Sequence, residues 1–386
     1  MRVLVVGDAG SIFVKQYIEY VLLDGRNEVV LIQEAAIPSG YLRFYEENQV
    51  AIEPLHRKEN HFSFRIPRLR STYGVFVWCR VMKKKYDHFD LLHIHGLNRC
   101  RGNIGYGLRD CVSKIAVSVW GDELFRRSGR GLAAARKYYD CADRITVSTG
   151  KMLKEFLRVY GGQYRDRITV NRFAVGLLTR IDGVREHTTR EEICKKFGIP
   201  HPDKRTVLIG YNGREAQRHI ELTKALQGMD RIELDKITLV YTMTYGVKSA
   251  GYLKKLEAAA KKRNCDFIVL QNFLNEDEMA QLRSISDILL HAQLTDGFSA
   301  SLQESLYSGT VVFNGEWLPY EEIPDAHHCM IEYADFDDMC AKLKRVLENF
   351  GEYRDRFSEN RGLLREISSR EKTTDLWKKS LGLGKC

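Results

Sequence analysis

Short runs rich in valine, isoleucine and leucine alternate with helical segments along most of the sequence. Continuous apolar runs of this length suit strands that helices bury on both faces. The alternation therefore predicts a doubly wound α/β layer in the first half of the chain. We expect strands over 2–6, 28–32, 90–94, 115–119 and 144–147, and helices over 12–23, 74–85, 131–141 and 151–160.

The same alternation restarts after a polar stretch at 179–190. With 386 residues, the chain is long enough for two domains, and we place the boundary near residue 180. The last segment, 353–381, is charged and helical in composition. In the second half we expect strands over 205–209, 237–241, 267–270, 288–290 and 311–313, and helices over 215–226, 249–263, 277–284 and 336–350.

A strand-to-helix corner follows the apolar run 288–290. Ser299 and Ser301 are both candidate N-caps, and Ser301 with Glu304 has the spacing of a capping box. The first amide groups of such a helix bind anions. Asp296 before the helix and Glu304 in its second turn lean the same way, so both can reach one ligand. A diphosphate over the helix start matches this layout, and an ordinary capped surface helix is the alternative.

The segment from Asp296 to Gly309 reads DGFSASLQESLYSG. It resembles the E-G-F-G-x-x-x-x-E-A-x-A-x-G signature of retaining family 4 glycosyltransferases. In that family the first acid faces the donor sugar and the second holds the nucleotide ribose, and Asp296 and Glu304 occupy those places. Phe298 and Gly309 match neighbouring positions. Asp for the first Glu keeps the charge but shortens the side chain by roughly 1.5 Å.

The resemblance implies the GT-B fold, an α/β architecture in which two Rossmann-like, doubly wound domains face each other across a cleft. It implies an acceptor-side domain over 1–182 and a nucleotide-sugar-binding domain over 183–365. By the same resemblance, the C-terminal helix, 366–386, crosses back to the first domain.

The segment 208–219 reads LIGYNGREAQRH and resembles the family's v-G-R-x-x-x-x-K-G segment, whose Arg and Lys clasp the donor diphosphate. Arg214 matches the Arg, Arg218 falls one residue before the Lys position, and His219 occupies that position. Two guanidinium groups can neutralise phosphates through charge-assisted hydrogen bonds. Surface arginines are the alternative. A positive charge at a helix start is unfavourable, however, which favours the functional interpretation.

Gly7 and Gly10 lie between the first expected strand and helix, where glycine allows a ligand to approach the backbone. A dinucleotide site would need a third small residue, and Phe13 stands there. By resemblance, Gly10 lines the cleft near the acceptor and the donor phosphates. A tight turn without a ligand is the alternative.

The segment 90–95 reads DLLHIH and is similar to the D-x-x-H-x-H run of the same family. His93 and His95 alternate with apolar residues, so both face one side of the sheet. No third ligand follows at a metal-binding spacing. We therefore expect no metal, a structural role for His93 and a cleft-lining role for His95.

The segment 118–122 reads SVWGD and resembles the family's v-x-H-G-x-D turn, whose His touches the donor sugar. Trp120 replaces that His, and Asp122 falls one step before the usual Asp. Trp120 either stacks on a sugar face or belongs to the core, and both interpretations stay open.

The net charge is +9 and the pI is about 9.0, which favours acidic partners. The segment 61–86 interleaves basic with aromatic residues, which is typical of contact with an anionic membrane; nucleic-acid binding and a solvated helix share this composition. No apolar run has the length of a membrane span, and the N-terminus does not read as a secretory signal. Nine cysteines occur without a C-x-x-C pair. We expect a cytoplasmic protein, with peripheral contact at the inner membrane face as a further hypothesis.

The resemblance implies retaining transfer of a sugar from a nucleotide-sugar to a hydroxyl of a glycan or lipid-linked saccharide, in bacterial polysaccharide or cell-envelope glycan assembly. The nucleotide-sugar is then a substrate, and we expect no cofactor and no nucleic-acid partner. The alternatives are a GT-B nucleotide-sugar epimerase and a non-catalytic sugar-nucleotide-binding or scaffold protein. The expected catalytic residues are Asp296, Arg214 and Arg218, and the expected substrate-binding residues are Glu304, Phe298, Ser299, Ala300, Gly10, His95, Trp120 and Asp122.

Overall fold

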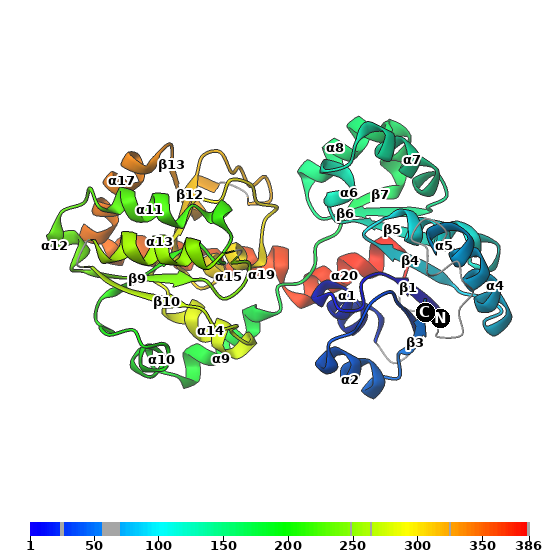
Figure 1. Cartoon of the computed structure of the whole chain (residues 1–386), viewed down its shortest axis with the longest axis horizontal. Coiled ribbons are helices and arrows are strands. Elements are labelled where there is room, and N and C mark those ends of the chain that lie inside the picture. The colour runs from blue at the N-terminus through cyan, green and yellow to red at the C-terminus, as the bar shows by residue number, and fades with distance from the viewer. Residues whose placement is uncertain (24–26, 56–69, 248, 263–264, 324–325, 384–386) are drawn as a thin grey trace. The chain divides into compact units, whose positions relative to one another are not determined.

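The computed structural model describes residues 1–23, 27–55, 70–247, 249–262, 265–323 and 326–383. Contacts divide the chain into two compact units, and Figure 1 labels many of their elements. Unit 1 comprises Met1–Ala174 and Arg370–Cys386, and unit 2 comprises Val175–Ser369. Each unit is a layered α/β structure with its own parallel sheet.

Unit 1 contains a seven-stranded sheet in the order β3-β2-β1-β4-β5-β6-β7, and every strand pairs in parallel with its neighbours. The strands are β1 (Arg2–Val6), β2 (Glu28–Gln33), β3 (Ala51–Pro54), β4 (Leu91–His95), β5 (Ile115–Val119), β6 (Arg144–Val147) and β7 (Ile168–Val170). The helices are α1 (Ile12–Tyr17), η1 (Ile18–Leu22), α2 (Ser39–Glu47), η3 (Arg70–Gly74), α4 (Val75–Lys85), α5 (Arg99–Leu108), η4 (Arg109–Cys111), α6 (Asp122–Phe125), α7 (Gly129–Asp140), α8 (Gly150–Tyr160), η5 (Gly162–Arg167) and α20 (Arg370–Leu381).

Helices bury both faces of this sheet, because successive residues of a strand point to opposite sides. Along β1, Leu4 and Val6 belong to a core cluster shared with α4, α5, α7 and α8. Val3 and Val5 belong to the cluster on the other face, which includes residues of α1, η1, α2 and α20. All four side chains are fully buried, which accounts for the continuous apolar sequence of this strand.

Unit 2 contains a six-stranded sheet in the order β10-β9-β8-β11-β12-β13, again parallel throughout. The strands are β8 (Arg205–Ile209), β9 (Ile237–Thr242), β10 (Asp266–Leu270), β11 (Ile288–His291), β12 (Val311–Gly315) and β13 (Ile331–Tyr333). The helices are α9 (Leu177–His187), α10 (Arg190–Phe197), η6 (Glu215–Gln217), α11 (His219–Leu226), α12 (Arg231–Leu234), α13 (Ala250–Lys261), α14 (Glu276–Ile285), α15 (Ala300–Tyr307), α16 (Ala326–Cys329), α17 (Phe336–Glu348), α18 (Phe350–Ser358) and α19 (Asn360–Ser368).

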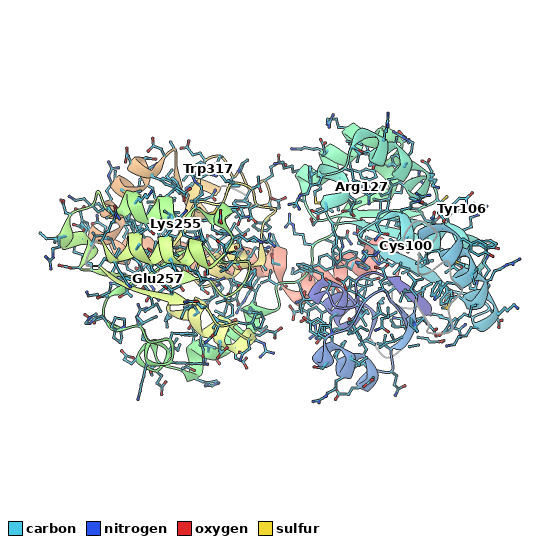
Figure 2. All side chains as sticks on the ribbon, in the orientation of Figure 1. Cys100, Tyr106, Arg127, Lys255, Glu257 and Trp317 are labelled. Atoms are coloured by element: carbon cyan, nitrogen blue, oxygen red, sulfur yellow. The ribbon has the colours of Figure 1, made fainter. Side chains whose placement is uncertain are left out.

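Two helical layers also enclose this second sheet. Leu208 of β8 packs in the cluster that contains residues of α9, α10, α14, α15 and α19. Val207 and Ile209 pack on the opposite face, in the cluster that contains residues of α11, α13 and α17. On α13, Leu256 is buried against the sheet whereas Lys255, labelled in Figure 2, is exposed. The amphipathic helices and apolar strands thus form one layered core.

The predicted doubly wound architecture is confirmed, and each of the ten expected strands is present within two residues at either end. The sequence analysis placed the boundary between the two domains in the polar stretch 179–190. This stretch instead lies largely in α9, which packs against α14 through residues such as Leu178 and Ile181. For this reason the two units divide after Ala174 rather than after residue 182. The charged segment 353–381 lies in α18, α19 and α20. None of the helices in the described ranges has both the length and the apolar character that a membrane span requires.

Candidate functional site

The strand order of unit 2 changes direction between β8 and β11. β9 and β10 continue outward from β8, whereas β12 and β13 continue outward from β11. In open α/β sheets, ligands bind outside the carboxyl ends of the strands at such a point. The loop after β8 carries Arg214 and Arg218, and the loop after β11 carries Asp296. Strand order therefore brings the two predicted loops to one edge of the sheet.

Two hydrogen bonds join these loops directly. The backbone N–H of Leu294 donates to the carbonyl of Ala216 at 3.1 Å. The hydroxyl of Tyr211 donates to Oδ1 of Asp296, also at 3.1 Å. The arginine-bearing loop and the acid-bearing loop are thus parts of one structure, held in a fixed relation by backbone and side-chain contacts.

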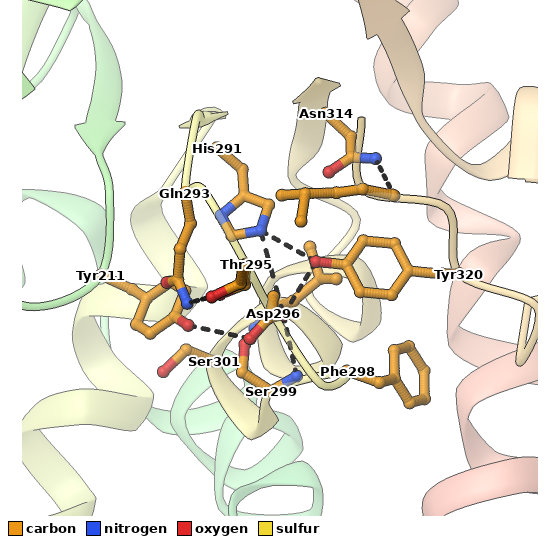
Figure 3. Close-up of polar contacts among 12 residues, drawn as sticks. Tyr211, His291, Gln293, Thr295, Asp296, Phe298, Ser299, Ser301, Asn314 and Tyr320 are labelled. Carbon is orange, nitrogen blue, oxygen red and sulfur yellow. Dashed lines mark hydrogen bonds and ion pairs between the residues drawn. The ribbon is translucent and has the colours of Figure 1, made fainter. Parts of the chain in front are cut away.

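The carboxylate of Asp296 is buried and well satisfied, with 5% of the side chain exposed. Besides Tyr211, the hydroxyl of Tyr320 donates to Oδ2 at 2.8 Å, and the N–H of Ser299 donates to the same atom at 3.1 Å (Figure 3). A carboxylate offers about four lone-pair positions, so these three donors leave about one for a ligand. Asp296 lies before the helix, as predicted, and it fixes the helix start as well as facing the site.

His291, the last residue of β11, extends the same network. Its Nε2 lies 2.9 Å from the hydroxyl of Tyr320 and 3.9 Å from Oδ2 of Asp296. Burial lowers the pKa of His291 to about 4, against the opposite effect of the Asp296 carboxylate. The ring is therefore neutral at pH 7. Because Tyr320 donates its only proton to Asp296, His291 must donate from Nε2, which fixes the tautomer.

Burial also keeps both tyrosines of this network protonated. It raises the pKa of Tyr320 and of Tyr211 far above the usual value, and the neighbouring Asp296 carboxylate raises them further. Both hydroxyls therefore remain hydrogen-bond donors throughout the neutral range. The network holds one negative charge among neutral donors.

The helix after the loop begins where the sequence predicts. Ser299 is the N-cap of α15, and its hydroxyl accepts from the N–H of Leu302 at 3.3 Å. Phe298 adopts a left-handed backbone, with φ of 63°, and its side chain is buried. Ala300, the first residue of the helix, is exposed. The start of an eight-residue helix is thus open to solvent beside Asp296.

The predicted capping box of Ser301 and Glu304 is wrong. Ser301 lies inside α15, and Glu304 turns to Arg283 of α14, whose Nε donates to Oε2 at 3.1 Å. Arg283 is fully buried and Glu304 is 8% exposed, so a charged pair in the interior replaces the local cap. Asp296 and Glu304 have different partners, and no contact joins them in the described part of the chain.

The arginine-bearing loop has a constrained backbone. The N–H of Gly213 donates to the carbonyl of Tyr245 at 2.7 Å, and a Cβ on Gly213 would lie 2.3 Å from Cγ2 of Val247. Only glycine fits this close approach. Arg218 itself has a left-handed backbone, with φ of 61°, which is uncommon for a residue with a side chain. Such strain persists where surrounding structure fixes it, and it is concentrated at functional sites.

The two predicted arginines lie differently. Arg214 is exposed, and its backbone N–H donates to the side chain of Asn212 at 2.9 Å. The Arg218 guanidinium lies 4.4 Å from the ring centre of Phe336 and 5.5 Å from that of Trp317, which Figure 2 labels. His219, at the family's Lys position, is fully buried and bonds through Nδ1 to the Tyr252 hydroxyl. The structure records no direct contact between these arginines and Asp296 or Glu304 among the described residues.

Unit 1 has its own change of strand direction, between β1 and β4. Gly10 follows β1, and its N–H donates to Oδ1 of Asp8 at 3.0 Å in a tight turn. His95 ends β4 and is fully buried against Tyr17, with ring centres 4.6 Å apart. Burial holds the pKa of His95 well below its usual range, so the ring is neutral. Both predicted residues thus lie at the expected edge, His95 within the aromatic core.

Trp120 and Asp122 lie in the turn after β5. Trp120 packs edge-on against Phe13 and Phe173, with ring centres 5.9 and 6.0 Å away. Asp122 is on the surface, where it pairs with Arg126 at 3.0 Å. The buried acid of this turn is its neighbour Glu123, which accepts from the N–H of Trp120 at 3.0 Å. The sequence analysis named Asp122, one step before the motif's Asp, whereas Glu123, at that step, is the acid that holds the turn.

The remaining predictions concern ions and the basic segment. Within the described ranges, no three His, Cys, Asp or Glu side chains are grouped to hold a metal ion. Of the predicted basic segment 61–86, residues 61–69 lie outside the described residues. The rest forms η3 and α4, where Phe76 and Val81 are exposed beside the exposed basic residues Arg80 and Lys84.

The sequence analysis did not identify four residues of the site. Tyr211, His291 and Tyr320 gather around Asp296, and Arg283 holds Glu304. Only His291 had a usable signal, a polar residue at the end of an apolar strand. The others reach the site because distant segments fold together.

Comparison with known proteins reveals similarity only at the level of structure. No family model and no curated protein matches this sequence. A glycosyltransferase from Rickettsia africae is 13% identical, with 99% of each chain covered and a TM-score of 0.74. Anabaena HepE in complex with UDP is 12% identical, with 100% of each chain covered and a TM-score of 0.72. UDP-GlcNAc 2-epimerase from Neisseria meningitidis, bound to UDP-GlcNAc, is 11% identical over 100% of each chain, with a TM-score of 0.63. The chain therefore has the GT-B fold, built from two Rossmann-like units.

Proposed function

We propose that this protein transfers a glycosyl group from a nucleotide-sugar to a hydroxyl acceptor, with retention at the anomeric carbon. The observation that carries this proposal is the meeting of the Asp296 loop with the arginine-bearing loop where strand order changes between β8 and β11. The complexes of HepE with UDP and with UDP-glucose, in a chain of the same fold, support a nucleotide-sugar as the ligand class.

In this proposal unit 2 binds the donor. Arg214, Arg218 and the start of α15 hold the diphosphate, because guanidinium groups and free helix amides both favour phosphate oxygens. The exposed position of Ala300 leaves these amides accessible beside Phe298 and Ser299. Arg218, which is half-buried, would change rotamer from its place over Phe336 and Trp317 to reach the ligand.

The acids orient the sugar and the nucleoside. Asp296 accepts a hydrogen bond from a sugar hydroxyl at its remaining lone-pair position, while Tyr211 and Tyr320 hold the carboxylate in place. Glu304 binds the ribose hydroxyls, and Arg283 fixes the orientation of its carboxylate. Residues proposed for the acceptor side are those of unit 1, namely Gly10, His95, Trp120 and Asp122.

The chemistry is then stabilisation of a leaving group. The bond from the anomeric carbon to the donor phosphate oxygen breaks, and a bond to the acceptor oxygen forms on the same face. The acceptor's proton passes to the departing diphosphate. Positive groups placed where phosphate charge develops lower the barrier, and this scheme involves no cofactor or metal. The proposed enzyme is cytoplasmic, and its acceptor is a glycan or a lipid-linked saccharide in bacterial polysaccharide assembly. The segment 61–86 is proposed to make peripheral contact with the membrane.

A donor panel tests this function. The full chain is incubated with UDP-, GDP- and TDP-sugars, and release of the nucleoside diphosphate is measured with wild type, Asp296→Asn and Arg218→Gln. We expect slow hydrolysis of at least one donor by the wild type and a loss of at least tenfold in each variant. Arg231→Gln is the matched control, since Arg231 is exposed in the same unit. No release from any donor would overturn the proposal.

A second candidate is a nucleotide-sugar epimerase, because the N. meningitidis epimerase shares the fold over its whole length. An epimerase needs acids in unit 1, and Glu123 is the buried one nearest the predicted turn. The same panel separates the two functions: an epimerised nucleotide-sugar would favour the second, and free nucleoside diphosphate favours the first.

A further inference from the structure

Unit 2 has a pocket of about 480 Å³ at the opposite edge of its sheet from the proposed donor site. Arg205, which lines it, begins β8, and Ile285 and Ser284 line it just before β11. The five residues of β8 separate the two edges by about 16 Å. A ligand in this pocket is therefore distinct from a donor bound at the carboxyl ends of the strands.

Four arginines line the pocket: Arg185, Arg190, Arg205 and Arg354. No Asp or Glu is among the described residues that line it. Within the described ranges, the one carboxylate in contact with these arginines is Asp287, which is fully buried. Four positive charges against one negative charge leave an excess of three. A concave surface with one sign of charge concentrates ions of the opposite sign.

Arg190 joins the segments that surround the pocket through hydrogen bonds. Its guanidinium donates to the carbonyl oxygens of Pro202, Ile285 and Lys204 and, at 2.6 Å, to Asp287. A guanidinium has five N–H donors, so these bonds leave Arg190 almost none for a ligand. Its role is to anchor the elements that surround the pocket.

The other three arginines retain donors. Arg354 bonds to Asp287 at 2.9 Å, and Arg185 bonds to the carbonyl of Ser308. Each uses one of its five donors in these bonds. The Arg205 guanidinium has no hydrogen bond or ion pair within the described residues, and it lies 4.2 Å from the ring centre of Phe350. Most of the donors of three guanidinium groups are thus left for an anion.

The fold makes this arrangement possible at Gly309, which follows α15 and also lines the pocket. Its backbone is left-handed, with φ of 64°, and a Cβ there would lie 3.2 Å from Cα of Ser358. Glycine therefore lets α18 approach the end of α15 closely, and Arg354 of α18 lines the same pocket as Arg185. The hydroxyls of Thr188, Ser284 and Ser358, which also line the pocket, add further polar groups.

We propose that this pocket binds a phosphorylated small molecule. Planar guanidinium groups pair with phosphate oxygens through parallel hydrogen bonds, and three such groups match a ligand with one or two phosphoryl groups. The pocket has the volume usual for small-molecule sites. The four arginines repel one another, and Asp287 neutralises part of this charge by pairing with Arg190 and Arg354. A bound phosphoryl group would reduce the remaining repulsion.

Inorganic pyrophosphate is the probe, titrated into the full chain by isothermal calorimetry. The background carries Arg214→Gln and Arg218→Gln, which removes the guanidinium groups of the proposed donor site. Pyrophosphate should still bind in this background. Adding Arg205→Gln and Arg354→Gln should then weaken binding at least tenfold, whereas the proposal fails if affinity is unchanged or if the background itself binds no pyrophosphate.

A charge-matched control adds Arg231→Gln and Arg356→Gln, two exposed arginines that do not line the pocket. It should leave pyrophosphate affinity within twofold, and equal weakening in this control would overturn the proposal. If the double substitution in the pocket disturbs folding, Arg205→Gln alone serves, because the Arg205 side chain makes no hydrogen bond to any described residue that its loss would break. That single change should still weaken binding at least threefold, and unchanged affinity would contradict the proposal.

Discussion

Asp296 and Glu304 lie eight positions apart, yet their carboxylates have different surroundings. Two hydroxyls and an amide satisfy Asp296, whereas the guanidinium of Arg283 satisfies Glu304. When one of several neutral donors to a carboxylate is removed, the loss of stability is modest. Removal of either member of a buried ion pair leaves an isolated charge, which costs much more. The two acids therefore predict different mutational responses.

Tyr320→Phe tests the Asp296 network. It removes the donor to Asp296 and the acceptor for His291, so we expect a loss of about 1–3 kcal/mol in the free energy of unfolding. Urea-induced unfolding of the full chain measures this loss. Tyr353→Phe is the control, because no hydrogen bond of the Tyr353 hydroxyl is present in the described part of the chain. Equal urea midpoints for the two variants would contradict the network.

Glu304→Ala tests the buried pair. The variant leaves Arg283 fully buried without an opposite charge, so we expect a loss of about 3–5 kcal/mol in stability, together with weaker donor binding. The double variant Arg283→Met, Glu304→Leu should be more stable than Glu304→Ala, since no charge remains. Thermal unfolding of the three proteins checks the order. If the double variant is the least stable, the pair does not act as described.

A contact between two residues can be predicted from the sequence when they lie close together along the chain. Ser299 was predictable as an N-cap because its partner, Leu302, is three residues away. Tyr211 and Tyr320 come from segments 85 and 24 residues from Asp296, so only the fold identifies them. The spacing of Ser301 and Glu304 predicted a capping box that does not form, because Glu304 accepts a hydrogen bond from the buried Arg283 on another helix.

At the scale of elements, close packing explains the helix α5, which the sequence analysis did not predict. α5 contains Gly102, Gly105 and Gly107, which weaken any helical signal. A Cβ at these positions would lie 2.7 Å from Tyr138, 2.8 Å from Ile94 and 2.9 Å from Cys79. The glycines therefore serve helix–sheet and helix–helix contact rather than a turn. Strands were easier to predict, since burial on both faces makes them continuously apolar.

Gly309→Ala tests the junction of α15 and α18. A side chain there meets both a left-handed backbone and the nearby Ser358 backbone, so we expect a loss of about 1–3 kcal/mol in stability. Gly351→Ala is the matched control on α18, because a Cβ there meets nothing within 4 Å. It should be neutral or stabilise the helix by about 0.5–1 kcal/mol. Unfolding midpoints that fall equally in both variants would contradict this account.

At the scale of the whole molecule, the alternation of apolar runs and helices was enough to predict two doubly wound sheets. The fold similarity to GT-B proteins at 11–13% identity agrees with this, since layer patterns persist where individual residues do not. The composition could not reveal that histidines would be buried in both units. His93 and His95 lie in the core of unit 1, and His219 and His291 in that of unit 2.

Buried histidines make stability depend on pH. Burial lowers the pKa of His219 and of His291 to about 4, whereas histidine in an unfolded chain titrates near 6.5. Between these values the unfolded chain binds more protons, so the free energy of unfolding falls as the pH drops from about 6.5 toward 4. Urea midpoints measured from pH 7 to pH 5 should decrease, and His219→Gln should reduce the slope. A midpoint that is constant or rises on acidification would contradict this.

The most direct measurement is a crystal structure of the full chain with the nucleotide-sugar that the donor panel selects. The account predicts the diphosphate at the start of α15, within hydrogen-bonding distance of the amides of Ala300 and Ser301 and of the Arg214 or Arg218 guanidinium, with the ribose at Glu304. Electron density for the nucleotide-sugar at any other place in unit 2, or in unit 1, would contradict it.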